Sequence, residues 1–207
     1  MSGHFIVFEG IDGSGKSTQA QLLADALEAR GLAVFRTREP TADSPAGKQL
    51  REIARHGREG VSLEQEIELY FDDRVWHIEK EVAPALHRGD VVVCDRYWYS
   101  TAAYQGALGA NTSKLAAQSR ARFPDPHVVV YLRVPPEKAF ERISQNRAQL
   151  EKGYEKLDFL KKVFERYESL VEHSWLVIDG RRGQKEIAAD IAAAIFKKLS
   201  EKDQDLS

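Results

Sequence analysis

Five short runs of β-branched and aromatic residues alternate with longer amphipathic stretches along this chain, and this alternation constrains the fold most strongly. The runs are FIVF (5–8), AVF (33–35), VVVC (91–94), VVVYL (128–132) and WLVI (175–178). They do not alternate apolar with polar residues, which is typical of strands buried on both faces. Helices are predicted over 17–30, 62–87, 135–149, 157–173 and 185–199. The pattern predicts an α/β fold with a parallel sheet and helices on both faces.

A single domain is expected over residues 1–207. The chain is long enough for one sizeable core, and we find neither an interdomain linker nor an internal repeat in it. Only the tail 201–207 is polar enough to predict disorder. Ligands of such parallel sheets bind at the carboxyl ends of the strands, so residues that follow the five runs are the first candidates for a site.

Charge and cysteine content limit which binding partners and which cellular compartment can be expected. The 30 Lys plus Arg and 32 Asp plus Glu give a net charge of −2, so no overall field attracts the protein to nucleic acid or to an anionic membrane. The single cysteine, Cys94, excludes an intramolecular disulfide and a cysteine-rich metal site. Neither a signal pattern nor an apolar stretch approaching the ~20 residues of a membrane span is found. We therefore expect a protein of the cytoplasm that partners neither nucleic acid nor membrane.

The segment FEGIDGSGKST (8–18) contains the motif G-x-x-x-x-G-K-[ST] between a predicted strand and a predicted helix, which is the context this motif requires. Glycines let consecutive backbone N–H groups face a phosphate, and the helix N-terminus adds partial positive charge. Lys16 is predicted to reach the terminal phosphates, and Ser17 to offer a hydroxyl to Mg²⁺. The predicted ATP-binding loop comprises Gly10, Ile11, Asp12, Gly13, Ser14, Gly15, Lys16, Ser17 and Thr18.

Acidic residues mark two further positions. Asp12 lies inside the phosphate loop, where a carboxylate would repel phosphate, so we expect it to face a second substrate. Asp95 follows the run VVVC and has the placement of a carboxylate that holds the Mg²⁺ shell, although any strand of an α/β protein can end in aspartate. The adjacent Arg96 and Tyr97 add a planar phosphate-binding fork and an aromatic wall at the same strand end.

Two other arginines lie where they could face the predicted site at the carboxyl ends of the strands. Arg38 lies in TREP after the second run, and Arg74 lies in YFDDR within a predicted long helix. A solvated surface charge is the alternative interpretation for both, particularly for Arg74 with its two neighbouring aspartates.

Five segments that follow one another along the chain cover most of it: GIDGSGKSTQ, TREP, DRYWYSTAAYQG, PDPHVVVYLRVPPEKAFERI and EKLDFLKKVFERY. Together and in this order they resemble the thymidylate kinase family, whose members use ATP to phosphorylate dTMP. It implies a five-stranded parallel sheet, a donor site at the phosphate loop, an acceptor site over Asp12, a mobile lid, Mg²⁺ as cofactor and a homodimer.

The resemblance also assigns roles at the acceptor site. Asp12 would accept a hydrogen bond from the 3′-hydroxyl of the sugar, and Arg74 and Arg96 would bind the acceptor phosphate. Tyr70 takes the place of a family phenylalanine that stacks on thymine, and Tyr97 would pack against the 2′ face of the sugar. The complete implied set of substrate-binding residues is Asp12, Arg38, Pro40, Tyr70, Arg74, Arg96, Tyr97, Ser100, Tyr104 and Gln105.

A basic residue in this family lies either in the phosphate loop or in the lid. Because the loop position beside Asp12 is Gly13, the resemblance implies that the lid, about 142–155, supplies the charge. A solvated helix surface would have a similar composition. The implied catalytic residues are Lys16, Asp95, Arg96, Arg142, Arg147 and Lys152, with Ser17 and Asp95 as the metal site.

The chain departs from the usual family pattern at four places: residues 41–45 after TREP, Asp72, Arg133 and Lys152. The first two lead us to keep a kinase for another deoxynucleotide as an alternative to a dTMP kinase. A nucleotide-binding regulator without turnover is a third possibility, against which Lys16, Asp95 and Arg96 argue. A GTPase is a weaker fourth, because we find no guanine-binding motif of the N-K-x-D type.

Overall fold

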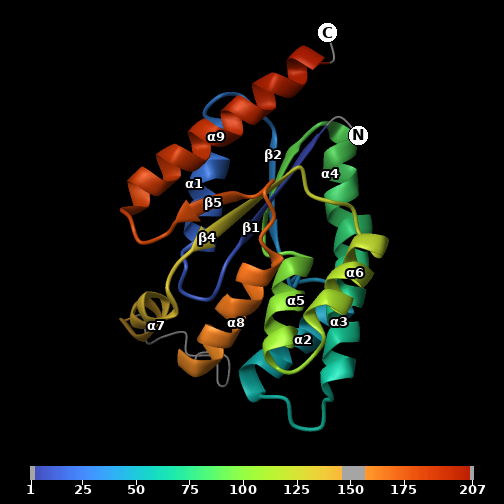
Figure 1. The fold of residues 1–207 in the computed structure, drawn as a ribbon. Coiled ribbons are helices and arrows are strands. Elements are labelled where there is room, and N and C mark those ends of the chain that lie inside the picture. The colour runs from blue at the N-terminus through green and yellow to red at the C-terminus, as the bar shows by residue number, and fades with distance from the viewer. Residues whose placement is uncertain (1–2, 146–156, 206–207) are drawn as a thin grey trace.

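A five-stranded, wholly parallel sheet forms the centre of the molecule (Figure 1). The computed structural model describes residues 3–145 and 157–205. The strands are β1 (His4–Glu9), β2 (Val34–Arg38), β3 (Val91–Asp95), β4 (Val128–Arg133) and β5 (Leu176–Asp179), in the order β2-β3-β1-β4-β5. The predicted α/β class and five-stranded parallel sheet are confirmed.

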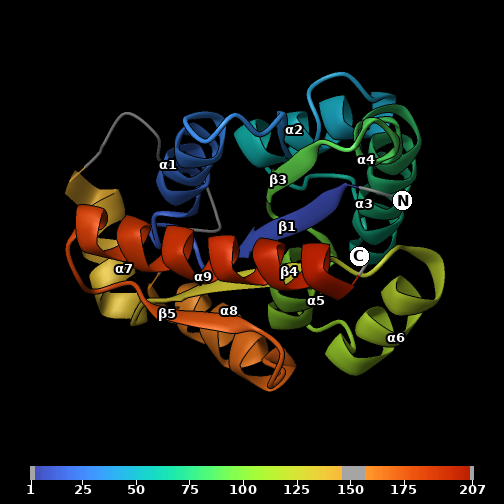
Figure 2. The ribbon, with the colours of Figure 1, turned by 90° about the horizontal axis from the view of Figure 1, so that it is seen from above.

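Alternate residues of the strands point into two separate apolar clusters, as period-2 geometry requires. One cluster joins Ile6 and Phe8 to helices α1 (Lys16–Glu28) and α9 (Gln184–Asp205). The other joins Phe5 and Val7 to helices on the opposite face, among them α5 (Trp98–Ala107) and α8 (Leu157–Leu170). Seen from above, α9 lies across the sheet with α5 and α8 beneath it (Figure 2). The absence of period-2 patterning in the strands thus reflects burial on both faces.

The predicted helix over 62–87 is three consecutive elements: α3 (Leu63–His77), the π-helical turn η1 (Ile78–Val82) and α4 (Ala83–Arg88). Ser62 and Gln65 form a capping box at its start, and Gly89, with φ 90°, ends it. Helix α7 (Pro136–Gln145) covers most of the predicted 135–149 helix, whose last residues lie outside the described chain.

Three helices were not predicted: α2 (Pro45–His56), α5 and α6 (Thr112–Arg122). Helix α2 follows a recognisable signal, because the Ser44 side chain accepts a hydrogen bond from Gly47 N and Pro45 begins the helix. Helix α5 is buried on almost every side, so its sequence lacks the amphipathic period that reveals a surface helix.

Helix α9 continues to Asp205 and so includes the first residues of the tail for which composition favours disorder. Within 3–145 and 157–205, no helix is long and apolar enough to cross a membrane.

Candidate active site

The phosphate loop connects β1 to α1 and needs glycine at three positions. Gly10, Gly13 and Gly15 have φ values of 144°, 76° and 95°, which L side chains rarely adopt. A Cβ at Gly13 would lie 2.4 Å from the carbonyl oxygen of Ala139 in α7, so this position has no room for a side chain. No side chain caps the N-terminus of α1, which leaves its first N–H groups facing the loop.

Lys16 folds back over the loop. Its Nζ donates to the Ile11 carbonyl at 2.9 Å and lies 3.5 Å from Ser14 Oγ, and only 5% of the residue is exposed. Burial, and then the nearby Arg96, lower the pKa of Lys16 to about 8. The ammonium group therefore occupies the space that a phosphate loop keeps for anionic oxygens.

Asp95 and Ser17 meet at the start of α1. Ser17 Oγ donates to Asp95 Oδ2, whereas Asp95 Oδ1 is buried and has no hydrogen-bond partner in the part of the chain that the structure describes. A hydroxyl and a carboxylate are hard oxygen donors of the kind that Mg²⁺ prefers, and the unsatisfied oxygen leaves one ligand position open. These two residues fit a magnesium site that keeps several waters. No cluster of three or more His, Cys, Asp or Glu suited to a metal occurs among the described residues.

Asp12, Arg96 and Tyr104 form one hydrogen-bonded group. Arg96 Nη2 donates to Asp12 Oδ1 and, at 3.3 Å, to the Tyr104 hydroxyl, which donates to Asp12 Oδ2 at 2.8 Å. Burial alone would raise the pKa of Asp12, but Arg96 and Lys16 outweigh it and hold that pKa below its ordinary value. The carboxylate in the phosphate loop is thus paired with an arginine at the end of the neighbouring strand. Arg96 itself has φ 76°, a strained conformation for a non-glycine residue.

Glu9, the last residue of β1, was not predicted as a site residue. It is fully buried and accepts hydrogen bonds from Tyr97 N at 2.8 Å, Ser100 Oγ at 2.7 Å and the Tyr167 hydroxyl at 2.7 Å. Burial raises the pKa of Glu9. Because Ser100 also accepts from Arg96 Nη1 at 3.0 Å, Glu9 connects the phosphate-loop strand to α5, α8 and Arg96. The sequence feature that could have identified Glu9 is a charged residue at the end of an otherwise apolar strand.

Arg74 is buried, not solvated. Its Nε donates to Glu39 Oε2 at 2.8 Å and its Nη2 to Thr101 Oγ1 at 2.9 Å, while Nη1 is buried without a partner among the described residues. Tyr70, one turn earlier on α3, is half-buried, as is Pro40, and Arg38 is exposed at the end of β2. The unpaired Nη1 leaves a donor for a ligand.

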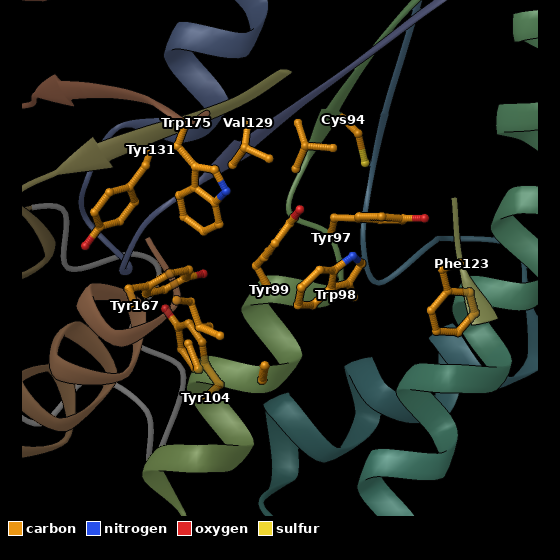
Figure 3. Packing of buried hydrophobic residues seen from close by; sticks show 14 of the residues in the cluster. Cys94, Tyr97, Trp98, Tyr99, Tyr104, Phe123, Val129, Tyr131, Tyr167 and Trp175 are labelled. Atoms are coloured by element: carbon orange, nitrogen blue, oxygen red, sulfur yellow. The ribbon is translucent and has the colours of Figure 1, made fainter. Parts of the chain in front are cut away.

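Two of the predicted substrate-binding residues are enclosed by other protein groups in this structure, and their contact with substrate stays a prediction. Tyr97 is fully buried within the apolar cluster (Figure 3). Its ring packs edge-on against Phe5, and its hydroxyl donates to the Pro124 carbonyl at 3.1 Å. Gln105 is also fully buried and donates to Glu66 at 3.2 Å. Tyr97 is the N-cap residue of α5 and Gln105 lies within this helix. Tyr104 lies beside Tyr167 (Figure 3). Its hydroxyl donates to Asp12 Oδ2 at 2.8 Å.

The segment expected to form the lid is described only at its start. Arg142 donates to the carbonyl of Gly180 at 2.8 Å and lies 3.5 Å from that of Gly13, so it connects α7 to the phosphate loop and to the end of β5. Arg147 and Lys152 lie outside the described residues, as does the lid itself from residue 146.

The other departures have structural explanations. Thr41 and Ser44 both donate to the buried Asp73, which fixes the loop 41–45 to α3. Asp72 is exposed and lines a groove between α2 and α3, away from the phosphate loop. Arg133 pairs with Glu168 at 3.0 Å.

Comparison with known proteins agrees with this geometry. The sequence model of a family described as "Thymidylate kinase" matches residues 8–191. This chain belongs to the thymidylate kinase family. It is 38% identical to a "Probable thymidylate kinase" of Pyrococcus horikoshii, over 96% of this chain and 98% of the relative. It is 40% identical to a "Thymidylate kinase" of Desulfotalea psychrophila, over 81% and 82%. It is 39% identical to one of Akkermansia muciniphila, over 95% and 93%.

In this member of the thymidylate kinase family, Asp12 lies between two sets of polar residues. The phosphate loop with Lys16, Ser17 and Asp95 lies on one side, and Arg96 with Ser100 and Tyr104 lies on the other. The parallel register explains this proximity, because Phe8 pairs with Asp95 and the N–H of Arg96 donates to the Phe8 carbonyl at 2.9 Å.

Proposed function

We propose that this protein transfers the γ-phosphoryl group of ATP to dTMP and releases ADP and dTDP. An oxygen of the acceptor phosphate forms a bond to the γ-phosphorus, and the bond from that phosphorus to the oxygen bridging it to the β-phosphorus breaks, with its electron pair leaving on ADP. The observation that carries the proposal is the Asp12–Arg96–Tyr104 group directly beside the phosphate loop. This group sets a carboxylate suited to a sugar hydroxyl and a guanidinium suited to a phosphate beside the donor loop.

On the donor side, the loop from Gly10 to Thr18 is proposed to hold the ATP phosphates. Lys16 Nζ exchanges its contact with the Ile11 carbonyl for phosphate oxygens and neutralises charge on the transferring group. Ser17 and Asp95 would hold Mg²⁺, which would offset negative charge on the ATP phosphates. The exposed Thr18 lies in the first turn of α1, within reach of the same phosphates.

On the acceptor side, Asp12 is proposed to accept a hydrogen bond from the 3′-hydroxyl, since 34% of its side chain is exposed although it is paired with Arg96. Arg96 offers a planar fork to the acceptor phosphate, and Arg74 has the unpaired Nη1. Tyr70 would stack on the base, with Arg38, Pro40, Ser100 and Tyr104 shaping the rest of the cleft.

Positioning and charge neutralisation are sufficient chemistry for phosphoryl transfer. The lid segment, with Arg142, Arg147 and Lys152, is proposed to add cations once the nucleotide is bound. Gly13 cannot carry a side chain, so the phosphate loop itself has no place for an additional cation.

A coupled ADP-release assay with a panel of nucleoside monophosphates tests the proposal. We expect dTMP to give the highest kcat/KM, with dUMP lower by a modest factor, because one methyl group in an apolar pocket contributes ~1–3 kcal/mol. A purine monophosphate ranking first would support the alternative, a kinase for another deoxynucleotide. If the protein binds ATP tightly but forms no ADP with any of the monophosphates, the regulator without turnover would be supported.

A homodimer is part of the proposal. A groove of about 1010 Å³ separates α2 from α3. Its charged lining includes Lys48, Arg51, Glu52 and Arg55 on α2 and Glu64, Glu68 and Asp72 on α3. A two-fold axis would set the mainly basic α2 of one copy against the acidic α3 of the other. Light scattering after gel filtration should give twice the monomer mass of 23.4 kDa, and the monomer mass would contradict it. ATP and dTMP are cytoplasmic metabolites, so the proposed location is the cytoplasm.

A further inference from the structure

His77 is fully buried at the C-terminal end of α3, outside the residues to which we have assigned a role. Its Nδ1 lies 3.0 Å from Glu39 Oε1, and its Nε2 lies 2.8 Å from Thr37 Oγ1 and 3.5 Å from Glu81 Oε2. The same Glu39 carboxylate receives Arg74 on its other oxygen. One imidazole therefore connects β2 and the π-helical turn to the carboxylate that holds Arg74.

The hydrogen-bond partners of the His77 ring indicate which of its two nitrogens carry protons. A threonine hydroxyl has one proton, and Thr37 donates it to Glu81 Oε2 at 2.9 Å. With that proton on Glu81, Thr37 Oγ1 accepts from His77 Nε2, and this assignment puts a hydrogen on Nε2. Burial raises the pKa of Glu39, but Arg74 and His77 outweigh it and the net pKa lies below its ordinary value, so this carboxylate accepts from Nδ1–H. Both nitrogens are donors only in the imidazolium form.

The charges balance when His77 is cationic. Glu39 and Glu81 carry two negative charges, and Arg74 and His77 carry two positive ones. The strand β3 contributes Cys94, whose pKa is raised by burial and by Glu39, so the thiol adds no charge. A neutral imidazole with its hydrogen on Nδ1 would still donate to Glu39, but it would not donate to Thr37 and would leave one negative charge of the group uncompensated.

The geometry fixes the orientation of Glu39. With Arg74 on Oε2 and His77 on Oε1, the carboxylate cannot rotate without losing one of two charged hydrogen bonds. Arg74, lying between the rings of Tyr97 and Phe123, is thereby held with Nη1 unpaired. The π-helical turn η1 starts directly after His77 and carries Glu81.

We propose that His77 is a positioning residue that acts as a buried imidazolium, orients Glu39, and through it holds Arg74 ready for the acceptor nucleotide. This inference depends on the proposed function for the acceptor role of Arg74.

Two substitutions at this position separate positioning from packing. In His77→Asn the amide nitrogen takes the place of Nδ1 and still donates to Glu39, whereas in His77→Gln it takes the place of Nε2 and faces Thr37. We expect His77→Asn to keep KM for dTMP within about threefold of the parent, and His77→Gln to raise it about tenfold or more, with KM for ATP unchanged in both, because a charged hydrogen bond contributes ~1.5–3 kcal/mol.

A packing role predicts the opposite order, since glutamine is closer to histidine in volume and is the better helix former. Equal KM values for dTMP in the two variants, or a parallel rise in KM for ATP, would overturn the proposal. His56→Gln, at an exposed histidine on α2, is the matched control and should change neither constant.

A measurement on the parent protein decides the matter even if a variant does not fold. The ¹⁵N chemical shifts of the His77 ring at pH 7 should show both nitrogens protonated, and a neutral tautomer would overturn the proposal. Arg74→Lys separates this inference from the proposed function. An unchanged KM for dTMP in Arg74→Lys contradicts the acceptor role of Arg74. A raised KM there, with equal His77 variants, contradicts only the role of His77.

Discussion

In the free protein, polar side chains at this site hydrogen-bond to one another and to the backbone, and a ligand must replace those hydrogen bonds. Lys16 donates to the backbone of its own loop, and Tyr104 uses one hydroxyl to bind both the side chain and the backbone N–H of Asp12. Each contact keeps a polar group paired in the free protein, and its loss on ligand binding must be offset by the new contacts. Substitutions at these residues should therefore affect binding more than folding.

The affinity for ATP should fall as the pH rises through about 8. The pKa of Lys16 is lowered to about 8 in the free protein, first by burial, whereas phosphate oxygens favour the charged ammonium in the complex. Binding above pH 8 then takes up a proton, and by linkage the dissociation constant rises up to tenfold per pH unit. Calorimetric titrations at pH 7 and pH 9, at constant Mg²⁺, measure this.

Lys16→Ala is the control for that measurement. It should abolish the pH dependence and lower kcat by several orders of magnitude while leaving the unfolding midpoint nearly unchanged, because the lost charge acts on the transferring group. Turnover within about tenfold of the parent would contradict the catalytic role of Lys16.

Tyr104→Phe should weaken acceptor binding, and Tyr97→Phe should not. The Tyr104 hydroxyl contacts Asp12 and Arg96, so its removal releases the group proposed to hold the sugar and phosphate. A loss of ~1–2 kcal/mol corresponds to a rise in KM for dTMP of roughly five- to thirtyfold. The Tyr97 hydroxyl contacts only the Pro124 carbonyl among the described hydrogen bonds. Steady-state kinetics with both variants tests this, and similar KM values would contradict the assignment.

At the scale of elements, the phosphate loop is held between β1 and α7. The carbonyl of Ala139 in α7 lies where a side chain at Gly13 would be, and Arg142 of the same helix donates to Gly180. The loop conformation thus depends on a helix that comes more than 120 residues later. Helix α5 also contacts the loop, since the hydroxyl of its Tyr104 binds the side chain and the backbone N–H of Asp12.

Gly13→Ala should destabilise the protein more than Gly15→Ala. Both positions have positive φ, which costs about 1 kcal/mol for alanine, but only Gly13 has a neighbouring backbone atom in the way, since a Cβ at Gly15 meets nothing within 4 Å. The additional steric cost is expected to be ~1–3 kcal/mol. Urea unfolding of both variants measures the difference, and equal stabilities would show that α7 moves freely away from the loop.

At the scale of the whole molecule, one sheet separates two apolar clusters, and every strand contributes to their common wall. Leu160 of α8 is buried in one cluster, and Ile191 of α9 in the other. Because the strands belong to both, loss of packing on one face should destabilise the other, and the chain should unfold as one cooperative unit.

Leu160→Ala and Ile191→Ala should each lower the free energy of unfolding by ~2–5 kcal/mol within a single transition. Trp98 and Trp175 both lie in the cluster of Leu160, so tryptophan fluorescence reports chiefly on that face, whereas far-UV circular dichroism includes α9. Coincident urea transitions by both methods are expected. A separate fluorescence transition in Leu160→Ala would indicate two cooperative units.

The sequence by itself determined the features that depend on neighbouring residues. The phosphate loop, the five strands, and the place of Asp95 at a strand end follow from local patterns, because contiguous backbone must either pair, turn or bind a ligand. The sequence also predicts that Asp12 faces a second substrate, because a carboxylate in that loop would repel phosphate, but it did not predict the pairing of Asp12 with Arg96 and Tyr104.

Only the tertiary structure decided which side chains face the site. Tyr97 and Tyr104 lie seven residues apart in one motif and are both buried, yet the hydroxyl of Tyr97 donates to the Pro124 carbonyl and that of Tyr104 donates to Asp12. The roles of Glu9 and His77 depend on partners 158 and 38 positions away in the chain, Tyr167 and Glu39. Local sequence does not encode such distances, because the direction of a helical side chain is determined by how the whole helix packs on the sheet.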